Sequence, residues 1–445
     1  MSMDDKNKQD RTKSNMKISR HHWRKRIKKS RSSLRWKKAL LLFAFLIPMP
    51  LIIQASDIKG RFYVSDYYSN DSSHNDLQIV SSKLRLYKQE DEKPGFYFNL
   101  DGEIRKKISE GDNPLKKRLN ELWVGYKFPQ NLNAIVGRQY IYQLFNTYID
   151  GLNLKYEIKK GVGFGVFGGL APDLYDNSID GKFKSFGAYG FLDQDTYQFY
   201  IGCEDLMYEG ATDRQYCSAR LNSALSKKVR LDGLSSVSIN QATNKFELEN
   251  ASANVSYAAT RDLRFQLFYD YYRAIKYFES SKKIFADYDY IDNYFLDTNS
   301  QSRAGGRVDY KLAKKLNVYA SAAYQTRKID NDHAVRYTGG FRTYDLGGFN
   351  LSGRYTHIDN FNSENDEFNV ELARNFFNKV DVSVYASKEK EKLDIEGGFT
   401  TGTLTYGTSV YWQLNKNYFV SMFVERYDGD DYYNTSVFTQ AGYRF

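Results

Sequence analysis

The chain has 445 residues and is rich in aromatic side chains, with 38 Tyr and 30 Phe but only 6 Pro. Its mean hydropathy of −0.63 excludes a membrane protein built from many helices. Of its 64 basic and 54 acidic residues, 15 and 3 lie in residues 1–55, which leaves 49 basic and 51 acidic residues for the rest. The net charge of +10 therefore belongs to the N-terminal segment and does not indicate a nucleic-acid partner.

The N-terminal segment has the order of a signal peptide. A long basic stretch precedes the apolar run Ala39 to Ile53, and Gln54-Ala55 then offers a small residue before Ser56. The apolar run is too short for a comfortable membrane-spanning helix, and two prolines interrupt it. We expect residues 1–55 to be a cleaved signal peptide with an extended basic region; an uncleaved inner-membrane anchor is the alternative.

From Ile58 to the last residue, the chain repeats one unit, in which about ten residues alternate between apolar and polar before a polar turn. Phe96 and Phe98, for example, alternate with Asn99 and Asp101. This alternation predicts about 22 strands, within a range of 16–24. The predicted strands begin near residues 58, 77, 95, 118, 134, 148, 162, 183, 196, 214, 229, 246, 263, 301, 316, 334, 349, 366, 380, 401, 418 and 433.

A soluble β-sandwich would also show alternating strands. The segments here are long for a sandwich, and Tyr and Phe gather near their ends, as in an aromatic girdle. Tight turns such as Ser226-Lys227-Lys228 also alternate with longer linkers, the longest from Lys276 to Ser300. We therefore predict an all-β fold, a transmembrane antiparallel up-and-down β-barrel over residues 56–445. The alternation starts almost directly after the expected cleavage site, so no N-terminal plug domain is expected.

The chain resembles the outer-membrane β-barrels of Gram-negative bacteria, porin-like members in particular. The leader, the alternating segments and the terminal Tyr443-Arg444-Phe445 carry this resemblance, and Gly137-Arg138-Gln139 with Asp150-Gly151-Leu152 is similar to a pattern of some porin-like barrels. The resemblance implies location in the outer membrane among its lipids and lipopolysaccharide. Because the predicted number of strands is even, we expect both chain termini on the periplasmic side. The resemblance also implies that Tyr443 and Phe445 form the signal read by the barrel-assembly machinery.

Cys203 and Cys217 are the only cysteines, and they flank the predicted loop from Tyr208 to Asp213. Counting outward from that loop places them nearly opposite each other on adjacent strands. A redox or metal-binding pair is one interpretation. We favour a cross-strand disulfide formed in the oxidising periplasm.

Motifs for enzyme chemistry are lacking after the leader. The three histidines there, His74, His333 and His357, have no partners at the spacing of a metal cluster or a catalytic triad. Asp330, Asp332 and His333 share one predicted loop, which we interpret as a surface loop and not as a hydrolytic site. The loop 276–300 mixes aromatic and acidic residues; it could bind sugars or a cation, but we favour a loop that packs over the barrel mouth. We expect no catalytic residues, no bound metal, no cofactor and no enzymatic activity.

The alternation assigns more bases than acids to the face opposite the apolar one, which in a membrane barrel faces a water-filled lumen. The clearest of these predicted pore-lining bases are Arg138, Arg264, Arg307, Arg336, Arg342 and Arg354. The last four lie on neighbouring predicted strands and could form one basic wall, or they could be structural arginines paired with Asp309 and with tyrosines.

The basic lumen favours a porin-like channel for passive diffusion of small hydrophilic solutes, with a preference for anions. The alternative is a sheath or scaffold that holds a lumenal or periplasmic protein partner in an electron-conduit or polysaccharide-export system. A barrel of about 22 strands encloses a wide lumen that needs filling, so infolded loops or such a partner would have to narrow it.

Overall fold

The computed structural model describes residues 57–73, 75–91, 93–108, 116–144, 147–172, 178–240, 245–273, 300–393, 398–430 and 432–445. Within these ranges the chain forms one sheet of 22 strands. Among the described residues, no helix is long and apolar enough to cross a membrane. The expected signal peptide and most of the aromatic loop 276–300 lie outside the described residues.

The strands follow one another along the chain: β1 (Lys59–Asp71), β2 (Asp76–Lys88), β3 (Gly95–Lys107), β4 (Lys116–Lys127), β5 (Leu132–Ile141), β6 (Thr147–Lys159), β7 (Val162–Pro172), β8 (Ile179–Asp193), β9 (Tyr197–Tyr208), β10 (Ala211–Ala224), β11 (Val229–Asn240), β12 (Lys245–Ala258), β13 (Leu263–Arg273), β14 (Ser300–Ala313), β15 (Leu316–Arg327), β16 (Asp332–Thr343), β17 (Asn350–Asn360), β18 (Ser363–Phe376), β19 (Val380–Leu393), β20 (Phe399–Gln413), β21 (Tyr418–Gly429) and β22 (Tyr433–Arg444).

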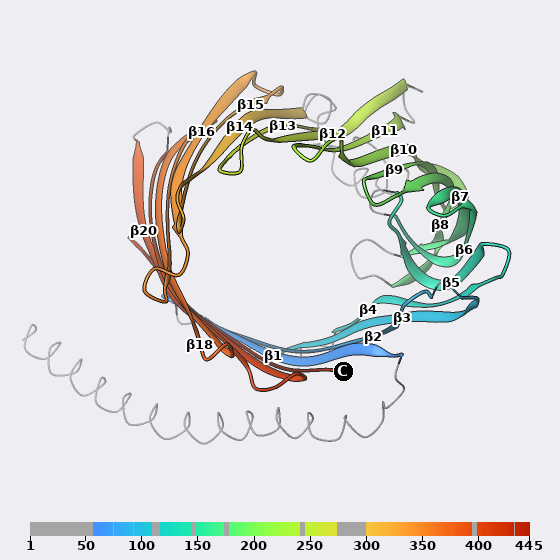
Figure 1. Cartoon of the computed structure of the whole chain (residues 1–445), viewed down its shortest axis with the longest axis horizontal. Coiled ribbons are helices and arrows are strands. Elements are labelled where there is room, and N and C mark those ends of the chain that lie inside the picture. The colour runs from blue at the N-terminus through green and yellow to red at the C-terminus, as the bar shows by residue number, and fades with distance from the viewer. Residues whose placement is uncertain are drawn as a thin grey trace, which may run out of the picture. The chain divides into compact units, whose positions relative to one another are not determined.

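Each strand pairs antiparallel with the next strand in the chain, and β1 also pairs with β22, so the sheet closes into a barrel (Figure 1). At the closing seam, the backbone N–H of Gly60 donates to the carbonyl of Phe445 at 3.0 Å, and the N–H of Phe445 donates to the carbonyl of Gly60 at 3.1 Å. Closure leaves no sheet edge at this seam, which is the condition for a sheet to survive in lipid. The predicted barrel class is confirmed.

The predicted number of strands is also confirmed, and each predicted start lies within four residues of the observed one. The alternation of short turns and long loops is less strict than predicted. On the side of the barrel away from the termini, β9 and β10 are joined only by Glu209 and Gly210, and β17 and β18 only by Phe361 and Asn362. Glu209 and Gly210 both have positive φ, which fits the tight turn of a two-residue hairpin.

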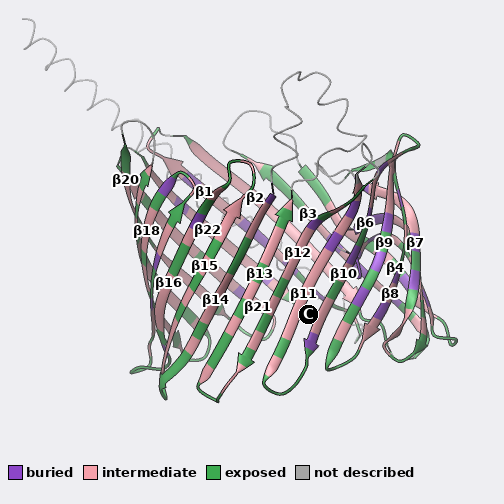
Figure 2. Cartoon of the chain, turned by 90° about the horizontal axis from the view of Figure 1, so that it is seen from above, coloured by how far each residue is buried: buried purple, intermediate pink, exposed green. Residues whose placement is uncertain are grey.

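The two faces of the barrel wall differ in chemistry. On β13, the exposed side chains Phe265, Leu267 and Tyr269 alternate with Gln266 and other polar residues of the opposite face, and Leu267 is 65% exposed. Figure 2 shows these strands tilted in the barrel wall, with exposed and intermediate segments following one another along them. An apolar outer face and a polar inner face are what a water-filled barrel in a bilayer requires.

One section of the wall departs from this rule, because its inner face also carries large apolar side chains. The curled section β5–β9 (Figure 1) buries a cluster made of Ile141, Leu144, Ile149, Phe167, Tyr189, Phe191 and Tyr200. We call this section the apolar lobe. Its aromatic rings pack directly on glycine residues of the neighbouring strands. A Cβ on Gly165 would lie 2.3 Å from Cζ of Tyr189, and a Cβ on Gly187 would lie 2.3 Å from Cζ of Phe167, so a larger residue would displace these rings.

Burial of such large side chains stabilises the lobe by about 1.5–3 kcal/mol each. The lobe also occupies part of the barrel interior with its own side chains. A barrel of this strand number therefore fills some of its lumen without an added plug.

Candidate pore-lining site

The structure places five of the six predicted pore-lining arginines on one face of the sheet, on β13, β14, β16 and β17. Register pairs share a face; Arg264 pairs with Asp309, Gly340 with Arg354, and Ala323 with Arg336. A concavity of about 730 Å³ takes its walls from β10 through β18 and includes Arg307, Arg336 and Arg354. A hollow shared by nine neighbouring strands of a closed wall lies on the inside of the barrel, so these arginines face the lumen.

A second concavity, of about 880 Å³, lies beside the first on the lumen wall and takes in Arg264, Arg307 and Asp309. Arg342 lies near Glu371 in a smaller hollow of about 220 Å³. The arginines thus follow one stretch of the lumen wall, from β13 to β17. We call this stretch, defined by Arg264, Arg307, Arg336, Arg342 and Arg354, the arginine wall.

The arginine wall contains paired and unpaired guanidinium groups. Arg307 donates to both carboxylate oxygens of Asp309, at 2.8 and 2.6 Å, and lies 4.1 Å above the ring of Tyr319. Arg354 donates to Glu367 at 2.6 Å. Among the described residues, no carboxylate oxygen lies within 4.0 Å of the guanidinium of Arg264, Arg336 or Arg342. Both interpretations drawn from the sequence therefore apply, each to a different part of the wall.

Two further arginines line the first concavity, and sequence reasoning missed them. Arg220 of β10 lies at its edge, and Arg303 of β14 donates to Asp270 at 2.7 Å. Arg303 is four residues before Arg307 and therefore shares its face. That same alternation would have identified Arg303 from the sequence.

Carboxylates gather on the adjoining part of the lumen wall. Register places six of them on the inner face of β18, β19 and β21: Glu367, Glu371, Asp381, Glu389, Glu391 and Glu425. Some hold polar neighbours, such as Tyr385, whose hydroxyl donates to Glu425. The lumen is therefore basic along β13–β17 and acidic along β18–β21, and ions in it experience a field across the pore.

The assignment of Arg138 to the lumen was wrong. Arg138 pairs with Leu122 and Asp150 in the sheet, on the same face as Val136, which is 60% exposed on the outside. The Arg138 side chain is only 5% exposed, and its guanidinium donates to both carboxylate oxygens of Asp150, at 2.7 and 2.6 Å. Alternation was ambiguous here, because the inner face of β5 carries Ile135 and Ile141 beside Asn133 and Gln139, so polarity alone does not mark the inside.

Cys203 and Cys217 are register partners on β9 and β10, with their Cα atoms 4.0 Å apart, and they form a disulfide. They lie on the outer face, in step with Ile201 and Ala219. On the inner face, the neighbouring Glu204 accepts hydrogen bonds from Ser185, Thr147 and Tyr216. The disulfide on the outer face of β9 and β10 and the buried polar cluster around Glu204 on the inner face therefore lie on opposite sides of the same part of the wall.

Tyr443 and Phe445 lie at the closing seam. Tyr443 pairs with Phe62 of β1 on one side and with Tyr418 of β21 on the other. The rings of Tyr443 and Phe445 stack with their centroids 5.5 Å apart. The assembly-signal role assigned to these two residues stays a prediction, but their position makes them part of the contact that closes the barrel.

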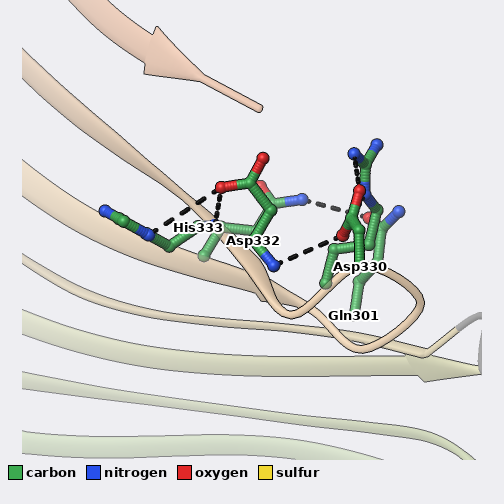
Figure 3. Close-up of polar contacts among 6 residues, drawn as sticks. Gln301, Asp330, Asp332 and His333 are labelled. Carbon is green, nitrogen blue, oxygen red and sulfur yellow. Dashed lines mark hydrogen bonds and ion pairs between the residues drawn. The ribbon is translucent and has the colours of Figure 1, made fainter. Parts of the chain in front are cut away.

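Asp330 lies in the turn between β15 and β16, whereas Asp332 and His333 begin β16, so only Asp330 lies in the predicted loop. The three residues form a compact set of local contacts (Figure 3). Arg327 donates to Asp330, and this hydrogen bond holds the pKa of that carboxyl below its usual value. Asp332 accepts from the backbone N–H of His333 at 2.7 Å and lies 3.9 Å from Nδ1 of the His333 ring, which turns away from Asp330 (Figure 3). Asp330 and the His333 ring therefore do not converge on a common point, and the three residues offer no hydrolytic arrangement.

Three side chains on the outer face lie close enough together to coordinate a cation. The ligand atoms of His357, Glu364 and Asp366 lie within 4.8 Å of one another at the β17–β18 hairpin. Asp366 is already engaged, since it accepts from Tyr355 at 2.5 Å and lies 2.9 Å from Nδ1 of His357. His74 lies outside the described residues.

A closed antiparallel barrel of 22 strands, apolar outside and charged inside, is the architecture of bacterial outer-membrane proteins. The protein is an outer-membrane β-barrel of the Gram-negative type, and its predicted location in the outer membrane is confirmed. No model of a known protein family matches the chain, and no curated protein matches its sequence.

Solved barrels similar to this chain differ strongly from it in sequence. OpdK of Pseudomonas aeruginosa, in a structure with vanillate, is 8% identical over 87% of this chain and 99% of its own, with a TM-score of 0.47. The translocation pore of the P pilus usher PapC is 9% identical over 87% of this chain and 99% of its own, with a TM-score of 0.46. OccAB3 of Acinetobacter baumannii is 11% identical over 88% of this chain and 100% of its own, with a TM-score of 0.43.

Proposed function

We propose that the protein is an outer-membrane channel for passive diffusion of small hydrophilic solutes and that it favours anions. The observation that carries the proposal is the unpaired state of Arg264, Arg336 and Arg342 on the lumen wall. A guanidinium with a carboxylate partner is nearly neutral to a passing ion, whereas one without a partner lowers the energy of an anion and raises that of a cation.

The acidic stretch on β18–β21 opposes a uniform preference for anions. Its charge lies along a different part of the circumference from the arginine wall, so an anion can pass close to β13–β17 and remain distant from β18–β21. We therefore propose that the channel favours anions because they pass along the arginine wall and at a distance from the acidic stretch. A strictly single-file filter would instead expose every ion to both signs of charge.

The apolar lobe supports a channel without an added plug, because it fills part of the interior that so many strands enclose. The sheath alternative makes a different prediction, since a barrel that holds a retained partner conducts poorly. We further propose that residues 1–55 direct export and that the barrel-assembly machinery inserts the folded chain among lipids and lipopolysaccharide. In this function the protein acts without a cofactor and is not an enzyme.

The test is single-channel recording of the purified protein in a planar bilayer under a salt gradient. We expect open-channel conductance and a reversal potential displaced toward that of the anion. A folded barrel that does not conduct would contradict the channel and favour the sheath, and a channel that prefers cations would contradict the role of the arginine wall.

A further inference from the structure

The second concavity of the lumen wall lies at the barrel mouth on the side where β1 begins and β22 ends. Each odd-numbered strand begins at this mouth, because successive strands run antiparallel. On the lumen face of β13–β15, Arg264 pairs with Asp309, and Lys311 pairs with Asn317. All four residues line the concavity, whose volume is about 880 Å³. We call this concavity the mouth hollow.

Two turns at this mouth also contribute to the lining of the mouth hollow. One turn joins β10 to β11 and carries Lys228, and the other joins β12 to β13 and carries Arg261. The hydroxyls of Ser226 and Thr260 accept hydrogen bonds from backbone N–H groups of their own turns, at 3.0 to 3.2 Å. The ammonium group of Lys228 donates to the carbonyl of Ala259 in the second turn, at 3.5 Å. Hydrogen bonds therefore fix the two turns that present these cations.

Positive charge dominates the mouth hollow, whose lining contains six basic and two acidic side chains and so carries a formal net charge of +4. The basic side chains are those of Lys227, Lys228, Arg261, Arg264, Arg307 and Lys311, and the acidic ones are those of Asp262 and Asp309. Within the described part of the chain, Asp309 binds Arg307, and no carboxylate oxygen lies within 4.0 Å of the other five basic groups.

Such a set of charges favours an anion with several charges over a monovalent one. A monovalent anion can neutralise only one cation at a time, whereas an anion with three or more charges can approach several together. The volume of the mouth hollow lies in the range of sites for small molecules. Ammonium and guanidinium groups both bind the oxygens of phosphates and carboxylates. The chemistry of the hollow therefore fits a small polyvalent oxyanion.

The mouth hollow continues the arginine wall. Gln266 and Arg307 line both the hollow and the first concavity, and Arg264 belongs to the wall and to the hollow. The hollow lies on β12–β15 and its adjoining turns, whereas the acidic stretch lies on β18–β21. An anion that moves along the arginine wall toward this mouth therefore reaches the hollow without passing the acidic stretch.

We propose that the mouth hollow is a binding site for a polyvalent oxyanion, a small solute with three or more negative charges on phosphate or carboxylate groups. Lys228, Arg261 and Lys311 hold it from the ends of three neighbouring hairpins. The proposal rests on the proposed channel only in that the mouth must be open to solutes. It adds a specific ligand site, which passive diffusion does not require.

The test is isothermal titration calorimetry of the full barrel in detergent, which measures binding whether or not the barrel conducts. The probes are tripolyphosphate and citrate, with acetate as the monovalent control. We expect the better of the two polyanions to bind at least about tenfold more tightly than acetate. Its binding should weaken as salt is added, because salt screens the lysines and arginines. The comparison of tripolyphosphate with citrate separates a phosphate ligand from a carboxylate ligand.

Variants test whether the mouth hollow is the site. Replacing Arg261 and Lys311 together by Gln should weaken polyanion binding by about tenfold, because two cations without carboxylate partners are lost. The matched control replaces Lys379 and Lys416 by Gln. These two lysines lie in other turns at the same mouth and outside the hollow, so the control removes the same charge. It should bind the polyanion as the unaltered barrel does.

Equal binding by the two variants, or polyanion binding no tighter than that of acetate, would overturn the proposal. Binding of a poly-glutamate peptide but of neither small polyanion would also overturn it and would make the mouth hollow a docking surface for an acidic protein. A barrel that binds the polyanion and does not conduct would support this site and contradict the proposed channel. A barrel that conducts and binds no polyanion would do the reverse.

Discussion

The selectivity of the arginine wall can be tested by separating its unpaired from its paired members. The perturbation is the triple replacement of Arg264, Arg336 and Arg342 by Ser, which removes three positive charges that no described carboxylate neutralises. An ion that passes at about 6 Å from one guanidinium in water gains or loses about 0.7 kcal/mol. Screening by salt, with a Debye length of about 8 Å at physiological ionic strength, reduces this to about 0.3 kcal/mol.

The same charge attracts an anion and repels a cation, so each encounter separates the two ions by about 0.6 kcal/mol. If an ion meets the three side chains one at a time, removing them lowers the anion-to-cation permeability ratio by about threefold. The effect is larger where two of them act on the ion together. The assay is the reversal potential of single channels in a planar bilayer under a salt gradient, which we expect to shift toward the potential for cations.

The matched control removes whole ion pairs and leaves the net charge of the wall unchanged. It combines Arg307→Ser with Asp309→Asn and Arg354→Ser with Glu367→Gln, since each arginine binds its own carboxylate. We expect no shift of the reversal potential in this variant. An equal shift in both variants, or no shift in the triple replacement, would refute the reasoning that only unpaired lumenal charge sets the preference.

Four further outcomes follow from the structure and the leader. Thiol labelling of the denatured, unreduced protein should find no free thiol, because Cys203 and Cys217 are bonded. Removing Phe445 should lower the yield of folded barrel in the heat-modifiability assay, because its backbone closes the sheet. Tyr189→Ala should destabilise the barrel by about 3–5 kcal/mol in denaturant unfolding, because it empties the lobe core. N-terminal sequencing of the protein from membranes should begin at Ser56.

Each of these four predictions has a control or a result that would contradict it. Two labelled cysteines would contradict the disulfide. Shortening an exposed loop should leave the folding yield unchanged, and an equal loss there would remove the special role of Phe445. Tyr337→Ala, at an exposed ring of the outer face, should cost much less than Tyr189→Ala. A mature protein that retains residues 1–55 would favour the uncleaved anchor.

The number and the starts of the strands could be predicted from the sequence, because side chains alternate between the two faces of any strand and water and lipid sort them by polarity. That signal is local, and it holds wherever one face meets lipid and the other meets water. It fails in β5, where Ile135 and Ile141 face inward and Val136 faces outward. With apolar residues on both faces, the sequence could not decide which way Arg138 points.

Partnership between charges on different strands was decided by the tertiary structure alone. Arg354 and Arg336 are equivalent in an alternating pattern, yet Arg354 is held by Glu367 of the next strand and Arg336 has no described carboxylate within 4.0 Å. The same holds for the pairing of β4 with β5, because the contact of Arg138 with the carbonyl of Leu119 depends on how far β5 runs beside β4. The sequence by itself determined the barrel, because alternation is a property of each strand. The register and curvature of 22 joined strands decided the lobe and the free arginines, because those depend on residues that meet only after the sheet has closed.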